Sequence, residues 1–327
     1  MLNSIQIDIL NHMSMFVVAD KRTFDIIVGG DSSYITRPLV RYGYISKWKD
    51  GIYTICAKGR CETEVDYSFI SVNGNKNSRE KAVKTSYICA LFFYNDIFPC
   101  SEISDVNKKY FIPSCYWRKI RTSILSTTRF VGMLVYNDLK LAVYLIDSAD
   151  MEWQLYAEGS LFFRTYGSWA TEADGMLMIC PENAPYIAER IIRRTMWERK
   201  SLIKGSYGYE NDKPVRYAKS PIRIKSTYKM VLLTDTVDLK KTLERIANIH
   251  QIKLNILKQM GGEFKEFRTC EIVRKNDSVC INPQNDLLKF IELYIERKTP
   301  YNEKYKLIMN EKYKNIAEMI GCEAIYV

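Results

Sequence analysis

Apolar residues recur at intervals of four and three near the start of the chain, which is the spacing of one helix face. The pattern begins behind a cap at Asn3 or Ser4, and its members are Ile5, Ile9, Met13 and Phe16. A second helix is expected behind Asp20, with Phe24 and Ile27 or Val28 turned inward. The Gly29-Gly30 pair predicts its end.

The stretch from Gly30 to Gly59 predicts a third helix and a β-hairpin. The expected elements are a helix opened by Asp31 and Ser32 and ended by Gly43, a strand at 44–48, a tight turn at 49–51 and a return strand at 52–57. Proline has no N–H and clashes with the carbonyl four residues earlier. Pro38 therefore predicts that the third helix either begins late, near Thr36, or is kinked.

Three helices followed by a hairpin are the order of a winged helix-turn-helix domain, which we expect over residues 1–62. In that fold the third helix enters the major groove of DNA, and the hairpin lies along the adjacent backbone or minor groove. The residues that would meet bases or phosphates are Ser32, Ser33, Tyr34, Thr36, Arg37 and Arg41 on the helix, and Lys47, Trp48 and Lys49 on the hairpin. The same fold also serves as a protein-docking module. A scaffold whose winged helix mediates self-association is therefore an alternative.

The hydrophobic period changes from residue 129 onward, where strands begin to alternate with helices. This predicts an α/β domain with a central mixed sheet over residues 129–327, in a chain that is α+β overall. A helical connector is expected at 63–128, with a helix at 79–94 whose inner stripe is Ala82, Ser86, Cys89 and Phe93.

A hairpin opens the expected α/β domain. Its strands are predicted at 130–136 and 139–146, joined by Asn137-Asp138. The later strands are expected at 176–180, 228–234, 253–257, 270–273, 279–281, 306–309 and 324–327, and the later helices at 184–195, 237–249, 286–297 and 311–320.

Positive charge is concentrated in one segment of the chain. The net charge is +10, and between residues 190 and 229 there are twelve Lys or Arg against three acids. We expect a basic, aromatic insertion at 194–226. Cations neutralise phosphates and rings stack on unpaired bases, so the candidates for DNA contact here are Arg193, Arg194, Arg199, Lys200 and Lys204. The plain alternative is a solvated loop anchored by its aromatic residues.

The sequence contains none of the catalytic motifs that we compared with it. There is no G-x-x-x-x-G-K-[ST] loop, no G-x-S-x-G elbow and no H-E-x-x-H, and the two histidines, His12 and His250, are expected to be structural. A metal-dependent nuclease is the alternative, and it would have to use Asp138, Asp147, Asp150, Glu152 or Glu158 with Lys140. These acids fit a surface better than a metal site, so we expect no metal or cofactor. With no complete catalytic motif the sequence favours a protein that is not an enzyme, and a degenerate nuclease-like domain stays the alternative.

The composition points to the cytoplasm. No apolar run reaches the roughly 18–20 residues that span a bilayer, and the N-terminus has no basic region with a cleavage site. The nine cysteines are scattered without the spacing of a disulfide framework. A basic chain of this kind favours polyanionic partners over membranes.

The order of elements resembles the replication-relaxation family of plasmids and conjugative elements. The likeness is carried by GIYTICAKGR (51–60), SREKAVKTSYICALFF (78–93) and RFVGMLVYNDLKLAVYLID (129–147). It implies a DNA-binding protein of a plasmid or other mobile element, acting in its replication, transfer or regulation. Val131-Gly132 stands where the family pattern has a Pro-Asp pair, so the resemblance does not extend to nuclease activity. The partners expected are double-stranded DNA, a second copy in a homodimer, and replication or transfer proteins.

Overall fold

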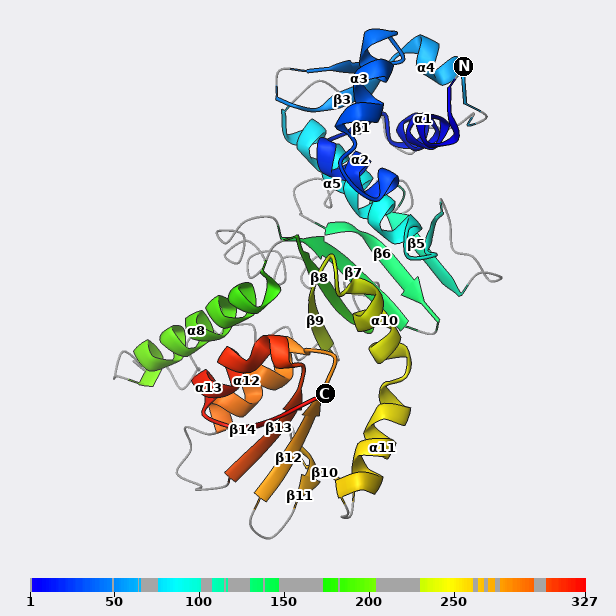
Figure 1. Ribbon diagram of the computed structural model, residues 1–327. Coiled ribbons are helices and arrows are strands. Elements are labelled where there is room, and N and C mark those ends of the chain that lie inside the picture. Colours follow the sequence, from blue (N-terminus) through cyan, green and yellow to red (C-terminus); the bar gives the residue numbers. More distant parts are fainter. Residues whose placement is uncertain are drawn as a thin grey trace. The chain divides into compact units, whose positions relative to one another are not determined.

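The computed structural model describes residues 2–48, 50–63, 65, 76–100, 108–114, 116, 130–137, 139–146, 173–181, 183–203, 230–260, 264–267, 270–273, 277–296 and 304–327. Over these residues the chain is a mixed α/β protein with two compact units, Met1–Asp138 and Leu139–Val327 (Figure 1). The described strands form a three-stranded, a five-stranded and a six-stranded sheet.

The first two helices begin where their capping residues predict. Helix α1 (Ser4–Phe16) begins behind Asn3, whose side chain accepts a hydrogen bond from the Gln6 N–H at 2.8 Å, while the Asn3 N–H donates to Gln6 Oε1 at 3.0 Å. Helix α2 (Lys21–Val28) begins behind Asp20, which accepts from the Thr23 N–H at 3.0 Å. Each carboxylate or amide satisfies a donor that the first helical turn leaves without a partner.

The third helix, α3 (Ser33–Arg41), contains Pro38. It begins at Ser33, so the late start near Thr36 is wrong. The start is fixed by Asp25 of α2, which accepts from the Ser32 N–H at 2.9 Å and from the Ser32 hydroxyl at 2.7 Å. Pro38 lies inside this helix and supplies no N–H for the carbonyl of Tyr34.

A small antiparallel sheet follows α3. Strands β2 (Ile45–Lys47) and β3 (Tyr53–Ile55) form the predicted hairpin, and β1 (Val18–Ala19) pairs with the other edge of β3, giving the order β1-β3-β2. The turn contains Gly51 at φ +78°, a conformation that glycine adopts without strain. One apolar core joins the helices to this sheet, and its buried members are Ile9, Leu10, Met13, Ala19, Phe24, Ile35, Leu39, Ile45, Tyr53 and Ile55.

A short helix, α4 (Ala57–Cys61), packs directly on the hairpin. Its Gly59 is buried, and a Cβ at this position would lie 2.3 Å from the carbonyl oxygen of Tyr44. The absence of a side chain is what lets the two backbones approach so closely.

Helix α5 (Lys76–Phe93) is buried on more than one side (Figure 1). Its predicted inner residues Ala82, Ser86 and Cys89 are buried, but Phe93 is 54% exposed, so its place in that stripe is wrong. The helix contacts α1, α2 and β1, and it also contacts the strands β4 (Phe98–Pro99), β5 (Lys109–Pro113) and β6 (Phe130–Tyr136). A helix between two layers has no single inner stripe, which is why the amphipathic pattern misled.

The six-stranded sheet has the order β4-β5-β6-β7-β8-β9. In the first unit β4 is parallel and β6 antiparallel to β5. In the second unit β7 (Leu139–Leu145), β8 (Gly175–Cys180) and β9 (Met230–Asp235) are parallel, as strand-helix alternation predicts. Helix α8 (Ala184–Ile203) follows β8. Residues 194–203 of the expected irregular insertion are therefore helical, and residues 204–226 lie outside the described residues.

Two helices, α10 (Leu239–Ala247) and α11 (Ile249–Met260), follow β9. The strand expected at 253–257 is wrong, because this stretch belongs to α11. Ile252, Ile256 and Met260 recur every four residues and pack on the five-stranded sheet. Branched residues such as isoleucine suit a strand locally, but here the helical spacing decides.

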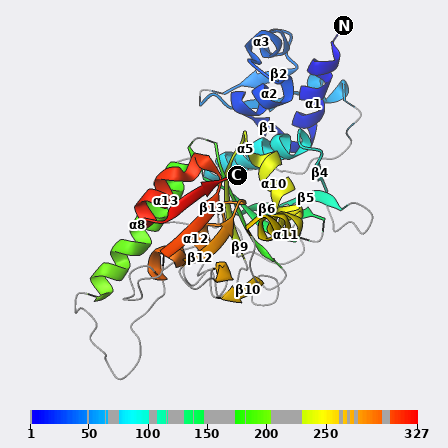
Figure 2. The same ribbon diagram turned by 60° about the horizontal axis from the view of Figure 1, so that its bottom comes forward.

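The five-stranded sheet ends the chain. Its strands are β10 (Phe264–Phe267), β11 (Cys270–Val273), β12 (Asp277–Asn282), β13 (Lys304–Met309) and β14 (Glu323–Tyr326), in that order. Its helices are α12 (Leu287–Glu296), the 3₁₀ turn η3 (Glu311–Tyr313) and α13 (Lys314–Ile320). The predicted elements are confirmed. Strands β12, β13 and β14 are parallel, with α12 and α13 on one face of the sheet and α11 on the other (Figure 2).

Candidate nucleic-acid interface

Helix α3 has a buried face and an exposed face. Ile35 and Leu39 are buried in the core of the first unit. Tyr34 is 66% exposed, and Arg37 and Arg41 are exposed at the spacing of the same outer face. Residues three and four apart are neighbours on a helix surface, so these three side chains form one strip.

Two of the predicted DNA contacts point into the protein. Ser32 is fully buried and its hydroxyl donates to Asp25, while the buried Thr36 hydroxyl donates to the Ser32 carbonyl at 3.1 Å. Neither hydroxyl is free to reach a base, because each holds the start of α3 in place. Ser33 is half-buried, and its hydroxyl donates to Asp31 at 2.7 Å. We therefore remove Ser32 and Thr36 from the candidate interface.

The cations of α2 are paired with carboxylates. Lys21 Nζ lies 2.8 Å from both Asp25 and Asp31, and Arg22 Nε lies 2.8 Å from Asp20. Hydrogen bonds from Lys21 and Ser33 lower the pKa of the Asp31 carboxyl to about 2. The positive charge of this helix is thus neutralised within a few ångströms.

Arg37 and Arg41 of α3 and Lys47 of the hairpin differ from the cations of α2. Within the described part of the chain, no carboxylate forms an ion pair with Arg37, Arg41 or Lys47. Arg41 lies over the ring of Tyr42 at 5.9 Å, and Lys47 lies over the ring of Tyr53 at 5.5 Å. An aromatic ring orients a cation but carries no net charge, so the three positive charges remain available.

The hairpin is anchored by a tryptophan. Trp48 is half-buried against Val18, Ile52 and the start of α5, and Arg79 of α5 lies over its ring at 5.2 Å. Trp48 thus packs the hairpin onto α5, with part of its surface still exposed. Lys49, the third predicted residue of the hairpin, lies outside the described residues.

Helix α4 adds two cations that the sequence reasoning did not select. Lys58 and Arg60 are both exposed, and Lys58 Nζ donates to the Tyr42 carbonyl at 3.0 Å while lying 4.4 Å from the Tyr44 ring centroid. The Tyr42 contact places Lys58 beside the end of α3. The signal in the sequence is the A-K-G-R run at 57–60, which directly follows the last strand of the hairpin.

Of the predicted DNA contacts at 193–204, Arg193 is the one whose side chain the structure describes. Arg193 is exposed and its Nη2 lies 2.7 Å from Glu189 Oε1, one turn away on the same helix. Arg194, Arg199 and Lys200 lie in α8, but their side chains fall outside the description. Lys204 lies outside the described residues altogether.

The acids of the nuclease alternative, Asp138, Asp147, Asp150, Glu152 and Glu158, also lie outside the described residues. Lys140 is exposed, and its N–H donates to Asp174 Oδ2 at 3.1 Å. No group of three or more metal-ligating side chains occurs among the residues that were described.

A second polar cluster lies at the carboxyl ends of β8 and β9. Lys312 Nζ contacts Asp235 and donates to Asp238 Oδ2 at 2.9 Å. Burial opposes the charge of Lys312, but hydrogen bonds to these carboxylates raise its pKa. Burial, and then the charge of Asp235, raises the pKa of the Cys180 thiol. A protonated thiol is a poor nucleophile, so the cluster ties η3 to β9 rather than offering a reactive cysteine.

Comparison of the chain with protein-family models, with curated proteins and with solved structures finds no match. In the described ranges no helix combines the length and apolarity required to cross a membrane.

Proposed function

We propose that this chain is a duplex-DNA-binding protein of a plasmid or other mobile element, in which residues 1–62 form a winged helix-turn-helix domain. Its role would lie in replication, transfer or regulation of that element, as the resemblance to the replication-relaxation family implies. The observation that carries the DNA-binding proposal is the exposed positive charge of Arg37, Arg41 and Lys47, which has no ion-pair partner among the described residues.

The arrangement of α3 suits the major groove. Its buried residues hold it against the core, so the strip of Tyr34, Arg37 and Arg41 is the face that a groove would receive. Arginine can donate two hydrogen bonds to the O6 and N7 acceptors of guanine, which gives these two side chains a means of reading sequence.

The flanking cations suit the DNA backbone. Lys47 on the hairpin and Lys58 and Arg60 on α4 are exposed. Between Ser33 and Thr63 the chain carries six Lys or Arg and two acids, a local excess of four positive charges. Such charge displaces counterions from the duplex and makes binding salt-dependent.

Selection of the full chain against a random duplex library tests the proposal and reveals the site. We expect one enriched sequence, bound about 10³-fold or more tightly than scrambled duplex, with affinity falling as salt rises. Equal affinity for selected and scrambled duplex would remove sequence recognition. A stable oligomer without affinity for any duplex would favour the scaffold alternative.

A further inference from the structure

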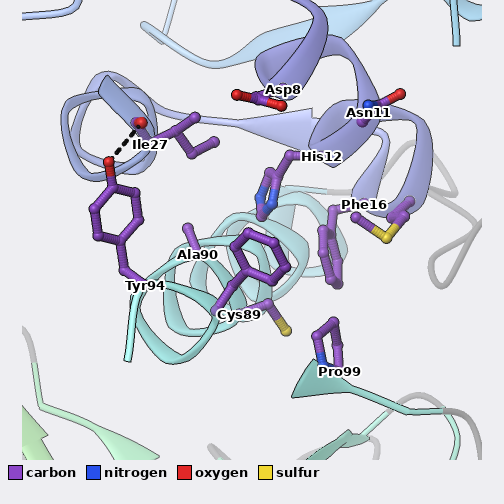
Figure 3. Close-up of a pocket in the computed structure, with 11 residues that line it drawn as sticks. Asp8, Asn11, His12, Phe16, Ile27, Cys89, Ala90, Tyr94 and Pro99 are labelled. Carbon is purple, nitrogen blue, oxygen red and sulfur yellow. Dashed lines mark hydrogen bonds between the residues drawn. The ribbon is translucent and has the colours of Figure 1, made fainter. Parts of the chain in front are cut away.

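A pocket of about 420 Å³ lies between α1 and α5 in the first unit (Figure 3). Its size falls in the range of roughly 300–1,000 Å³ that is typical of small-molecule sites. The lining residues come from α1, α2, α5 and β4, and they are Asp8, Asn11, His12, Met15, Phe16, Ile27, Cys89, Ala90, Phe93, Tyr94 and Pro99. None of them belongs to α3 or to the hairpin.

Aromatic side chains form much of the pocket wall. Phe16 lies against the His12 ring with centroids 4.6 Å apart, and Phe93 and Tyr94 at the end of α5 are both more than half exposed. The Tyr94 hydroxyl donates to the Ile27 carbonyl at 3.0 Å, which ties the end of α5 to α2 (Figure 3). This bond gives the pocket a defined edge.

Two polar side chains of α1, Asp8 and Asn11, line the same pocket. Asn11 Oδ1 is buried and has no hydrogen-bond partner among the described residues. Asp8, one turn earlier, is exposed and forms no ion pair within the described part of the molecule. The accessible acceptor is therefore the Asp8 carboxylate, and a ligand with a charged donor can form a charge-assisted hydrogen bond with it.

The histidine of the pocket adds no positive charge. His12 Nε2 lies 2.9 Å from the Ser86 hydroxyl, and burial lowers its pKa to about 3, so the ring is neutral near pH 7. The prediction of a structural histidine agrees with this position, and His250 is exposed on α11. Asp8 is therefore the one formal charge in the lining, and it is negative in a chain of net charge +10.

We propose that this pocket binds a small amphipathic organic cation, a protonated amine attached to an aromatic or aliphatic body. The body would lie against the exposed ring of Phe93, and the amine would donate to the carboxylate of Asp8. The aromatic faces favour a cation as well as an apolar group. The site is separate from the proposed DNA contacts, so it stands or fails independently of them.

Three probes with one ring system and different charges test the proposal. They are tryptamine, which is a cation, tryptophol, which is neutral, and indole-3-acetate, which is an anion, each titrated calorimetrically into the full chain. We expect tryptamine to bind about three- to tenfold more tightly than tryptophol, because only the amine pairs with the carboxylate. Indole-3-acetate should bind least. Equal affinity for all three, or no binding of tryptamine at millimolar concentration, overturns the proposal.

Matched variants locate the binding. Asp8→Asn should lower the affinity for tryptamine to that for tryptophol and leave tryptophol unchanged, while Phe93→Ala should weaken both probes. Glu62→Gln removes one exposed carboxylate outside the pocket and serves as the control for net charge. Circular dichroism confirms that each variant is folded. If Asp8→Asn binds tryptamine as tightly as the parent chain, the assignment is wrong.

A second copy of the chain is the competing occupant of this surface. Sedimentation of the parent chain and of Phe93→Ala distinguishes the two. If the parent chain is an oligomer that Phe93→Ala separates, and no probe binds either protein, the pocket belongs to a self-association surface and the ligand proposal is overturned.

Discussion

Helices α2 and α3 are neighbours in sequence and each carries two cations, but the cations of the two helices differ in their ion pairing. Lys21 and Arg22 of α2 are paired with Asp25, Asp31 and Asp20. Arg37 and Arg41 of α3 have no carboxylate partner in the described ranges. The paired charges lie beside the start of α3, and the charges of Arg37 and Arg41 are those that the proposed DNA contacts use. Counting Lys and Arg alone would have ranked the two helices as equals.

The largest expected effect separates these two helices directly. Arg37→Ala and Arg41→Ala should each weaken binding to the selected duplex by about 1–3 kcal/mol if they reach base edges. Lys21→Ala and Arg22→Ala are the matched controls, and they should change DNA affinity much less because their charges are already neutralised. Fluorescence anisotropy with a labelled duplex measures all four. Equal losses from both pairs would show that the pairing does not matter.

The next effect is a loss of folding stability when Asp25, the carboxylate of α2 that holds Ser32, is removed. Asp25→Ala removes the acceptor for the N–H and hydroxyl of Ser32, and it should lower the free energy of unfolding by about 1 kcal/mol, as loss of a helix cap does. Urea denaturation followed by circular dichroism measures the change. Asp50→Ala on the hairpin should cost less, because the hydrogen bond that Asp50 accepts from the Ile52 N–H is 3.4 Å long. A larger loss from Asp50→Ala would contradict this assignment.

A smaller effect should appear in the salt dependence of DNA binding. Lys47→Gln should reduce the slope of log affinity against log salt by about 0.9, the value for one phosphate contact. Its effect on sequence preference should be slight, since a phosphate contact carries no base information. Titrations at several salt concentrations measure the slope. A change in the selected sequence would instead place Lys47 at a base.

The smallest effect is a pH dependence of stability. The pKa of Asp31 is lowered from 3.8 to about 2 in the folded chain, so its contribution is present above pH 4 and is lost as the pH falls towards 2. Because Asp31 is exposed, the change should be slight and should weaken with salt. Asp31→Asn should flatten this part of the stability profile. An identical profile in both proteins would show that the Lys21 pair contributes nothing.

Most of the fold could be predicted because the period of the apolar residues is set by local geometry. The caps at Asn3 and Asp20 and the alternation of strands and helices are local signals, and each is confirmed. The strand expected at 253–257 failed because its neighbours Ile252 and Met260, outside the window, set a helical period. The prediction that Phe93 faces inward failed because the burial of each α5 residue depends on layers that are distant in sequence.

The candidate interface was harder to predict than the fold. A serine and a threonine beside a helix start serve equally well as base contacts or as caps, and only the position of Asp25 decides the role of Ser32. The pairing of Lys21 with Asp31 crosses ten positions and is invisible as a periodic pattern. The pocket was missed because Asp8 and Asn11 have the spacing of an ordinary solvated face. Their setting becomes clear only when α5 is in place.

The close approach of the Tyr44 carbonyl to Gly59 restricts which residues can occupy position 59 during evolution. Any side chain at that position would force α4 away from the Tyr44 carbonyl, and with it would move Lys58 from the end of α3. Relatives that keep this contact must therefore keep glycine at this position, even where the rest of the sequence has diverged. One glycine, four positions beyond the last hairpin strand, is thus a fingerprint by which remote descendants could be found.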